Sequence, residues 1–372
     1  MKLSFKTFIA EGGNFKVDGV GSTPLSIEPS SPDYRPRSDR QADLKELLHH
    51  VNQQHLQQTG HHLFGENGAA IENGSAFAGS THHFMNPNIS DDDLKSMGKT
   101  EFGDFDTQFA GQHIDSLNKL LRPGAKFGKY TVVGTKPQKD QNITLLRHDD
   151  GKTQQVDFEP ADYEGNSPSL WDQLSKSSPR KDLEEHIKGA FGKILNRAIA
   201  HGQGQTGIVR TKKGDKETFV PKSSFSIGLG LRPSHEQIGT ENGKPIFKEL
   251  TPKTATYTKD VPTIYRTMYG AEPTPQDINH FGSFHGGISS AQRHFSPEQQ
   301  SRVVDRYVDN IYGPDSQVIG PTHDKDQQMK DLTINHLRNA FPHHFTPEKE
   351  QEIADKRTAF YEKQRNKPPR EE

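Results

Sequence analysis

The sequence predicts an α/β (α+β) chain, in which strands and helices alternate in the first half and the C-terminal part is mainly helical. Residues 38–59 and 182–200 carry apolar side chains at the three- and four-residue spacing of a helix that packs one face on a core. Between these two helices, short runs rich in branched and aromatic residues, separated by turn signals, indicate strands. From about residue 261 onward, helical patterns are interrupted only by glycine and proline.

The helix over 38–59 is expected to start after Ser38 or Asp39, since both residue types suit a helix N-cap, and to stop at Gly60. Its apolar side chains recur at positions that share one face. They are Leu44, Leu47, Leu48 and Val51. This face is therefore expected to pack on the core.

The strands of the first half are short. A strand of small residues is expected over 75–78, and a helix over 113–121 separates the next strand from the later ones. The later pattern predicts strands at residues 102–109, 130–133, 143–147 and 154–158. The turn signal at Asp149-Asp150-Gly151 makes the last two of these strands a hairpin.

Three segments are expected along the chain. Residues 1–37 begin with a short amphipathic stretch and continue as a linker rich in glycine, serine and proline. Residues 38–215 contain the strands and helices described above and form the first domain. Residues 216–372 begin with strands near 223–231 and 246–250, become helical, and end in a charged, frayed tail.

Composition limits the chemistry that this chain can carry out. It has no cysteine, which excludes disulfides, cysteine-based zinc sites and thiol nucleophiles. Its formal net charge of −2 argues against a protein that coats nucleic acid over its whole surface. No apolar run approaches the roughly 18 residues that a membrane span requires, so no membrane partner is expected.

Carboxylates are the first candidates for a functional site. Asp104 and Asp106 lie two positions apart in an expected strand, so their side chains point to the same side. Such a pair repels itself unless a cation lies between, and hard oxygen ligands favour Mg²⁺, or Mn²⁺ in its place. Asp157 on a later strand would complete a two-metal arrangement. Glu159 is an alternative third carboxylate, although Pro160 is expected to end the strand there.

Gly79-Ser80 is the candidate phosphate-binding element. Gly79 has no side chain, so a phosphate group can come close to its backbone. The N–H groups near Ser80, together with its hydroxyl, can donate to phosphate oxygens, and they do so more effectively where a helix starts.

The Gly-Ser pair, the Asp-x-Asp pair and the third aspartate, taken in order, resemble the signature of the DNA polymerase β superfamily of nucleotidyltransferases. The resemblance covers roughly residues 38–200 and implies a short mixed sheet flanked by helices, with 38–215 as the catalytic domain. It implies metal-dependent transfer of a nucleoside monophosphate from a nucleoside triphosphate to a hydroxyl, with release of pyrophosphate. The acceptor stays open between RNA, protein and a small molecule. Residues 86–100 would be an insertion, because the first two motifs stand further apart than is usual in this family.

Two further resemblances point to tailed bacteriophages. Residues 157–188 are similar to uncharacterised nucleotidyltransferase-type phage proteins, which implies a phosphate contact for Lys188. Residues 1–11, which end in Ile9-Ala10-Glu11, resemble the capsid-targeting leader of internal phage proteins, which is cut after the glutamate. These resemblances imply a protein that acts in the cytoplasm of a bacterial host and is packaged in the virion.

Two other classes of function stay open. The first is a virion-internal or structural phage protein with an inactive nucleotidyltransferase fold, which loss of metal binding and a high copy number in particles would favour. The second is a module that binds RNA or DNA, which salt-sensitive binding to polynucleotide without a triphosphate would favour.

Overall fold

The computed structural model describes residues 15–138, 141–176, 179–211, 214–226, 229–251, 254–319 and 322–366. The fold is mixed α/β, with a mixed sheet flanked by helices and a mainly helical C-terminal part, which confirms the predicted fold class. The chain divides into two compact units, Met1–His186 and Ile187–Glu372. This division falls earlier than the expected boundary after residue 215, because helix α8 (Gly189–Gly202) packs against α11 (Phe284–His294) and α12 (Pro297–Tyr312) of the second unit.

The first unit is built around a five-stranded sheet in the order β3-β7-β6-β5-β4. Its strands are β3 (Asp104–Ala110), β4 (Lys126–Phe127), β5 (Tyr130–Pro137), β6 (Asn142–His148) and β7 (Thr153–Ala161). β3 and β7 run parallel, with Asp106 opposite Asp157, and the other neighbouring strands are antiparallel. The strands expected between residues 102 and 158 are therefore present, and the sheet is mixed.

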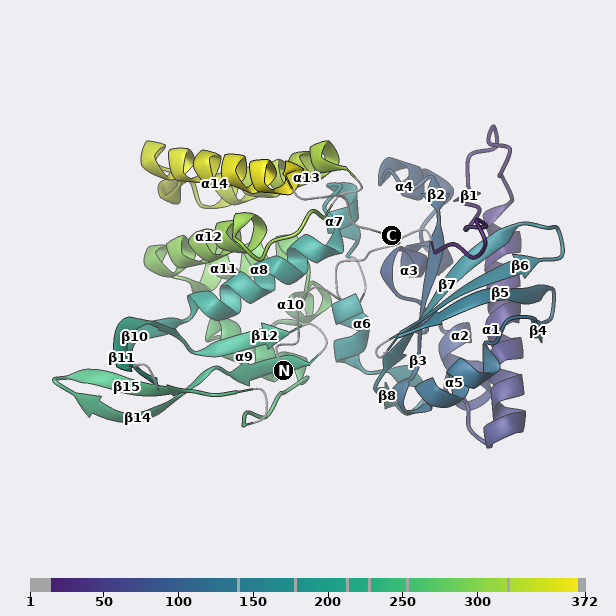
Figure 1. Ribbon diagram of the computed structural model, residues 1–372, viewed down its shortest axis with the longest axis horizontal. Helices are drawn as coiled ribbons and strands as arrows, with labels where there is room; N and C mark the ends of the chain where they lie inside the picture. The colour runs from purple at the N-terminus through teal and green to yellow at the C-terminus, as the bar shows by residue number, and fades with distance from the viewer. Residues whose placement is uncertain are drawn as a thin grey trace. The chain divides into compact units, whose positions relative to one another are not determined.

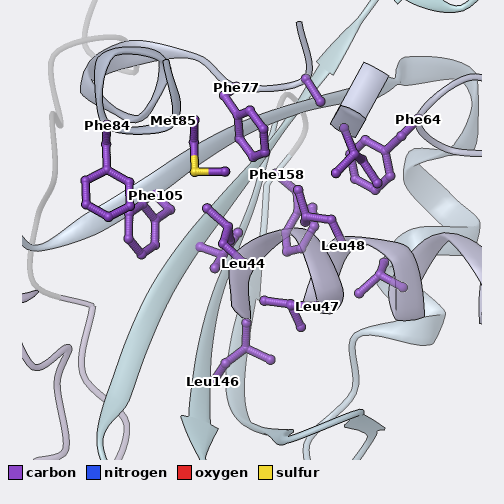
Figure 2. Close-up of a cluster of buried hydrophobic side chains, with 14 of the residues drawn as sticks. Leu44, Leu47, Leu48, Phe64, Phe77, Phe84, Met85, Phe105, Leu146 and Phe158 are labelled. Carbon is purple, nitrogen blue, oxygen red and sulfur yellow. The ribbon is translucent and has the colours of Figure 1, made fainter. Parts of the chain in front are cut away.

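Helix α1 (Arg37–Thr59) lies along this sheet (Figure 1). Its predicted apolar face is confirmed, since Leu44, Leu47, Leu48 and Val51 are all buried. Figure 2 shows three of them, Leu44, Leu47 and Leu48, beside Leu146 and Phe158 of the strands. Each buried side chain of this size contributes about 1.5–3 kcal/mol relative to exposure, so this face is enough to fix the helix on the sheet.

The C-terminal end of α1 lies where the sequence predicts it, and the N-terminal end does not. It ends at Gly60 as predicted, where a φ of 75° brings the glycine N–H onto the Leu56 carbonyl. It begins earlier than predicted, with Pro36 at the N-cap and no side-chain cap. The Arg37 guanidinium donates to the Phe84 carbonyl at 2.7 Å and to neighbouring carbonyls, so a tertiary contact extends the helix past the expected polar cap.

Short helices and strands complete the first unit. The helices are α2 (Ala69–Glu72), α3 (Gly79–Met85), α4 (Asp91–Ser96), α5 (Ile114–Leu120), α6 (Leu170–Lys176) and α7 (Arg180–Glu184), with 3-10 turns η2 (Glu66–Gly68) and η3 (Gly111–His113). The strands are β1 (Leu25–Ser26), β2 (Glu101–Phe102), β8 (Tyr163–Glu164) and β9 (Ser167–Pro168). The expected insertion at 86–100 contains α4, whose N-terminus is closed by a capping box of Ser90 and Asp93.

The strand expected over 75–78 is reduced to one isolated bridge, between Phe77 and Thr107. The Ala78 N–H donates to the Asp106 carbonyl at 3.1 Å, so the stretch still lies against β3. The prediction of a full strand is wrong because helix α3 begins at once and leaves too few extended residues for a ladder.

Part of the expected N-terminal linker is ordered against the first unit. β1 pairs with β2, with Leu25 opposite Phe102, and Ile27 is buried in the core. Residues 15–36 therefore do not form the predicted flexible linker. The leader expected at 1–11 lies outside the described residues.

The helix expected over 182–200 is two helices, α7 and α8. His186 adopts a positive φ of 57°, a conformation that does not continue a right-handed helix, and Lys188 is extended at the N-cap of α8. The apolar periodicity continues across this break, which is why the sequence pattern shows one helix.

The second unit combines hairpins with stacked helices (Figure 1). A four-stranded sheet has the order β11-β10-β15-β14, and β12 pairs with β13. The strands are β10 (Gly204–Thr211), β11 (Gly214–Pro221), β12 (Ser223–Ser226), β13 (Gly230–Pro233), β14 (His235–Glu241) and β15 (Lys244–Glu249). The strand expected over 223–231 is thus two strands of a hairpin. The further helices are α9 (Val261–Tyr269), α10 (Pro275–Asn279), α13 (His323–Ala340) and α14 (Pro347–Arg365), with the 3-10 turn η4 (Pro342–His344).

Helices α10, α12 and α14 of the second unit each begin with proline at the first helical position. Ser296 and Thr346 are the N-caps of α12 and α14, and each accepts a hydrogen bond from a backbone N–H of the first turn. Residues 367–372 of the expected frayed tail lie outside the described residues. Among the residues that the structure describes, no helix has the length and apolar character needed to cross a membrane.

Candidate metal site

Three carboxylates meet where two parallel strands of the first unit lie side by side. Asp104 and Asp106 share one face of β3, and the parallel register puts Asp157 of β7 opposite Asp106. A carboxylate oxygen of each lies within 4.8 Å of those of the other two. This set offers only hard oxygen ligands, which is the chemistry that Mg²⁺ or Mn²⁺ prefers.

Asp157 is the most enclosed of the three, with 8% of its surface exposed, while the other two are half-buried. Burial raises the pKa of the Asp157 carboxyl to about 7, and the charges of Asp104 and Glu159 add to this effect. A hydrogen bond of 2.8 Å from the Gln155 side-chain amide opposes it. The site therefore disfavours a full set of negative charges by itself, and a bound cation would offset that cost.

Gly79 lies in contact with the acidic site. It has a positive φ of 53°, and a Cβ atom added to it would overlap the Asp106 carboxylate oxygen Oδ2. Helix α3 begins at this glycine, and Ser80 follows it, half-buried. The absence of a side chain therefore allows the start of α3 to approach Asp106, beside the oxygen ligands.

Gly79→Ala is expected to weaken divalent-cation binding by roughly tenfold to a hundredfold, the range typical of changes next to metal ligands. The added methyl displaces the Asp106 carboxylate, and the positive φ adds strain of about 1 kcal/mol or more. Titration of Mn²⁺ followed by electron paramagnetic resonance measures the affinity. Gly74→Ala is the matched control, because Gly74 also has a positive φ, of 80°, but an added Cβ has no neighbour within 4 Å. Equal affinities for the two variants would contradict this role of Gly79.

Thr81 is a residue of this site that the sequence analysis did not identify. Its buried hydroxyl accepts a hydrogen bond of 2.8 Å from the Asp106 backbone N–H. Together with the bond from Ala78 to the Asp106 carbonyl, this contact holds α3 in register with β3. A threonine after Gly-Ser is a common pattern, so the sequence does not indicate that Thr81 contacts Asp106.

Glu159 and Lys176 extend the polar face of β7. The prediction that Pro160 ends this strand is wrong, because β7 continues to Ala161. The pairing of β7 with β6 already stops at Phe158. On the side that faces β6, Pro160 therefore interrupts no backbone hydrogen bond. The Lys176 ammonium lies 3.7 Å from the Glu159 carboxylate and donates to the Pro160 carbonyl at 2.6 Å. Glu159 is therefore paired with the Lys176 ammonium, whereas Asp157 belongs to the acidic cluster.

Lys188, expected to contact phosphate, belongs to the second unit. There it is the N-cap of α8, and its ammonium donates to the Ile319 carbonyl at 3.3 Å. Lys176 of the first unit lies 3.7 Å from the Glu159 carboxylate and 3.9 Å from that of Asp172, and no sequence pattern marks it.

The metal-free protein is expected to lose stability as the pH rises from about 4 to above 7. Over this range the folded protein keeps a proton on Asp157, whereas the unfolded chain releases it near the ordinary pKa of 3.8. The native state then binds more protons than the unfolded state, so the free energy of unfolding falls by a few kcal/mol as the pH rises. Urea unfolding in a chelator at about pH 5 and pH 8 measures this fall. Asp157→Asn should flatten it, and an unchanged slope in that variant would contradict the assignment.

Comparison of the chain with protein-family models, with curated proteins and with solved structures gave no match in any of the three.

Proposed function

We propose that this protein is a divalent-cation-dependent nucleotidyltransferase. The observation that carries the proposal is the convergence of Asp104, Asp106 and Asp157, with Gly79 at the start of α3 against the same carboxylates. An acidic cluster alone is common in proteins. An acidic cluster against which a glycine brings the start of a helix supports a site that handles a metal and phosphate groups together.

Residues of the first unit would have separate roles in the proposed reaction. Asp104 and Asp106 would hold the Mg²⁺ or Mn²⁺, which neutralises the triphosphate and lowers the pKa of the attacking hydroxyl. Asp157 would complete the metal site as the third carboxylate of the cluster and help to activate that hydroxyl. The hydroxyl oxygen bonds to the α-phosphorus as the bond to the pyrophosphate oxygen breaks, so that pyrophosphate leaves. Gly79 and Ser80 would bind the triphosphate through backbone N–H groups and the serine hydroxyl.

The wider context belongs to the same proposal. The acceptor is a hydroxyl of RNA, of protein or of a small molecule. The reaction takes place in the cytoplasm of a bacterial host after infection by the phage that packages the protein. These statements rest on the resemblances of residues 157–188 and 1–11.

Calorimetric titration of the full chain with each nucleoside triphosphate tests the proposal. We expect at least one triphosphate to bind in the presence of Mg²⁺ and to lose that binding in a chelator, since the carboxylates repel the phosphates without a cation. Absence of triphosphate binding under any metal condition would overturn the proposal. It would favour the inactive, virion-internal protein instead.

A further inference from the structure

Residues 15–23 lie against the strands that carry the acidic site, and we call them the N-terminal strap. The Thr23 N–H donates to the Thr153 carbonyl of β7 at 2.7 Å, and the Thr153 hydroxyl donates to the Gly21 carbonyl. Val17 and Val20 exchange two backbone hydrogen bonds of 2.9 Å across a tight turn. The strap is therefore held by its own turn and by the first residue of β7.

Ser22 of the strap joins the two strands of the acidic site. Its hydroxyl donates to the Gly103 carbonyl, directly before β3, and accepts the Gln155 N–H of β7 at 3.2 Å. In the parallel register Gln155 is the partner of Asp104. One hydroxyl thus bridges β3 and β7 at the level of the first metal ligand.

Gln155 connects the strap with the third ligand. It is 2% exposed, and its side-chain amide is used at both ends. The oxygen accepts the Phe15 N–H at 3.2 Å, and the nitrogen donates to the Asp157 carboxylate at 2.8 Å. Because both the oxygen and the nitrogen of the Gln155 amide are hydrogen-bonded, the contact with the strap sets the orientation of the amide. The amide in turn holds one carboxylate oxygen of Asp157 in position.

We infer that the N-terminal strap is part of the acidic site: through Ser22 and Gln155 it sets the position of Asp104 and Asp157, and thereby the affinity for a divalent cation. The inference rests on the proposed function only for the metal site and does not depend on a nucleotide. Residues that orient metal ligands from outside the ligand set typically change metal affinity by about 10- to 100-fold when they are replaced. Ser22 and Gln155 are positioning residues in this sense.

The strap also has an anchor away from the carboxylates. Val17 packs on Gly134 of β5, and a Cβ atom added to this glycine would overlap the valine side chain. Gly134→Val therefore moves the strap without removing any hydrogen-bonding group of the site.

The test is the affinity of the full chain for Mn²⁺, followed by electron paramagnetic resonance. Ser22→Ala and Gln155→Met are each expected to weaken binding by about 10- to 100-fold, and Gly134→Val is expected to act in the same direction. Ser22→Thr keeps the hydroxyl and should restore the affinity. Ser38→Ala and Gln53→Met are matched controls at exposed positions of α1 and should bind Mn²⁺ as the original chain does.

Circular dichroism and a melting curve establish that each variant is folded. Affinities in folded Ser22→Ala, Gln155→Met and Gly134→Val that equal those of the controls would overturn the inference. Failure of the original chain to bind Mn²⁺ would overturn both the inference and the proposed function. Binding of Mn²⁺ without binding of any triphosphate would overturn the proposed function alone, and the comparison of variants would still decide the role of the strap.

Discussion

Under the proposed function, replacement of Asp104 and Asp106 by asparagine is expected to reduce metal-dependent nucleotide transfer to background, a loss on the order of 10³-fold or more. Asparagine keeps the size of each side chain but removes both negative charges from β3, leaving only Asp157 of the three ligands. A hard divalent cation binds weakly to neutral amide oxygens, so the triphosphate loses its counter-charge. Calorimetry of Mn²⁺ and of the triphosphate measures both losses in the same variant.

The stability of this variant separates loss of the site from loss of the fold. The three carboxylates repel one another, so in a chelator the double variant should be at least as stable as the original chain. Added Mn²⁺ should stabilise only the original chain, by about 2.7 kcal/mol at a hundred times its dissociation constant. Asp92→Asn/Asp149→Asn removes two charges from exposed positions of the same unit and should leave Mn²⁺ binding intact. If the double variant at Asp104 and Asp106 still binds Mn²⁺ tightly, these two residues are not the metal ligands.

The acidic cluster was predictable because its geometry is local. Two-residue spacing in a strand places Asp104 and Asp106 on one face, and Asp157 lies on a strand that the pattern also identifies. The apolar face of α1 was predictable for the same reason, since a helical period needs no knowledge of the partner. The parallel register that sets Asp106 opposite Asp157 is a tertiary fact, and the sequence pattern does not contain it.

The parts that the sequence missed depend on contacts between distant residues. The sequence of the strap predicts a linker because its contacts produce no periodic pattern. Ser22 makes single hydrogen bonds with Gly103, 81 residues away, and with Gln155, 133 residues away. His186 breaks a helix whose apolar pattern is continuous, and its positive φ has no compositional signal such as glycine. Lys176 of α6 lies 3.7 Å from Glu159 of β7, a contact that no sequence spacing predicts, whereas the Lys188 ammonium donates to the Ile319 carbonyl.

The second unit contains a buried ion pair whose loss is expected to be costly. Lys330 and Asp326, one turn apart on α13, are both 0% exposed, and their charged atoms lie 3.1 Å apart. Asp326 also accepts the Tyr361 hydroxyl at 2.7 Å, and the Lys330 ammonium lies 3.9 Å from the centre of the Phe360 ring. The pair therefore fastens α14 to α13 through polar and aromatic contacts.

Lys330→Met is expected to lower the free energy of unfolding by about 3–5 kcal/mol, because it leaves the Asp326 carboxylate buried without its cation. Asp326→Asn/Lys330→Met should recover most of this loss, since no uncompensated charge remains. Arg338→Met breaks a half-exposed pair with Glu350 and should cost about 1 kcal/mol or less. Urea unfolding of the four proteins measures these differences. A cost for Lys330→Met no larger than that of Arg338→Met would contradict the importance of the pair.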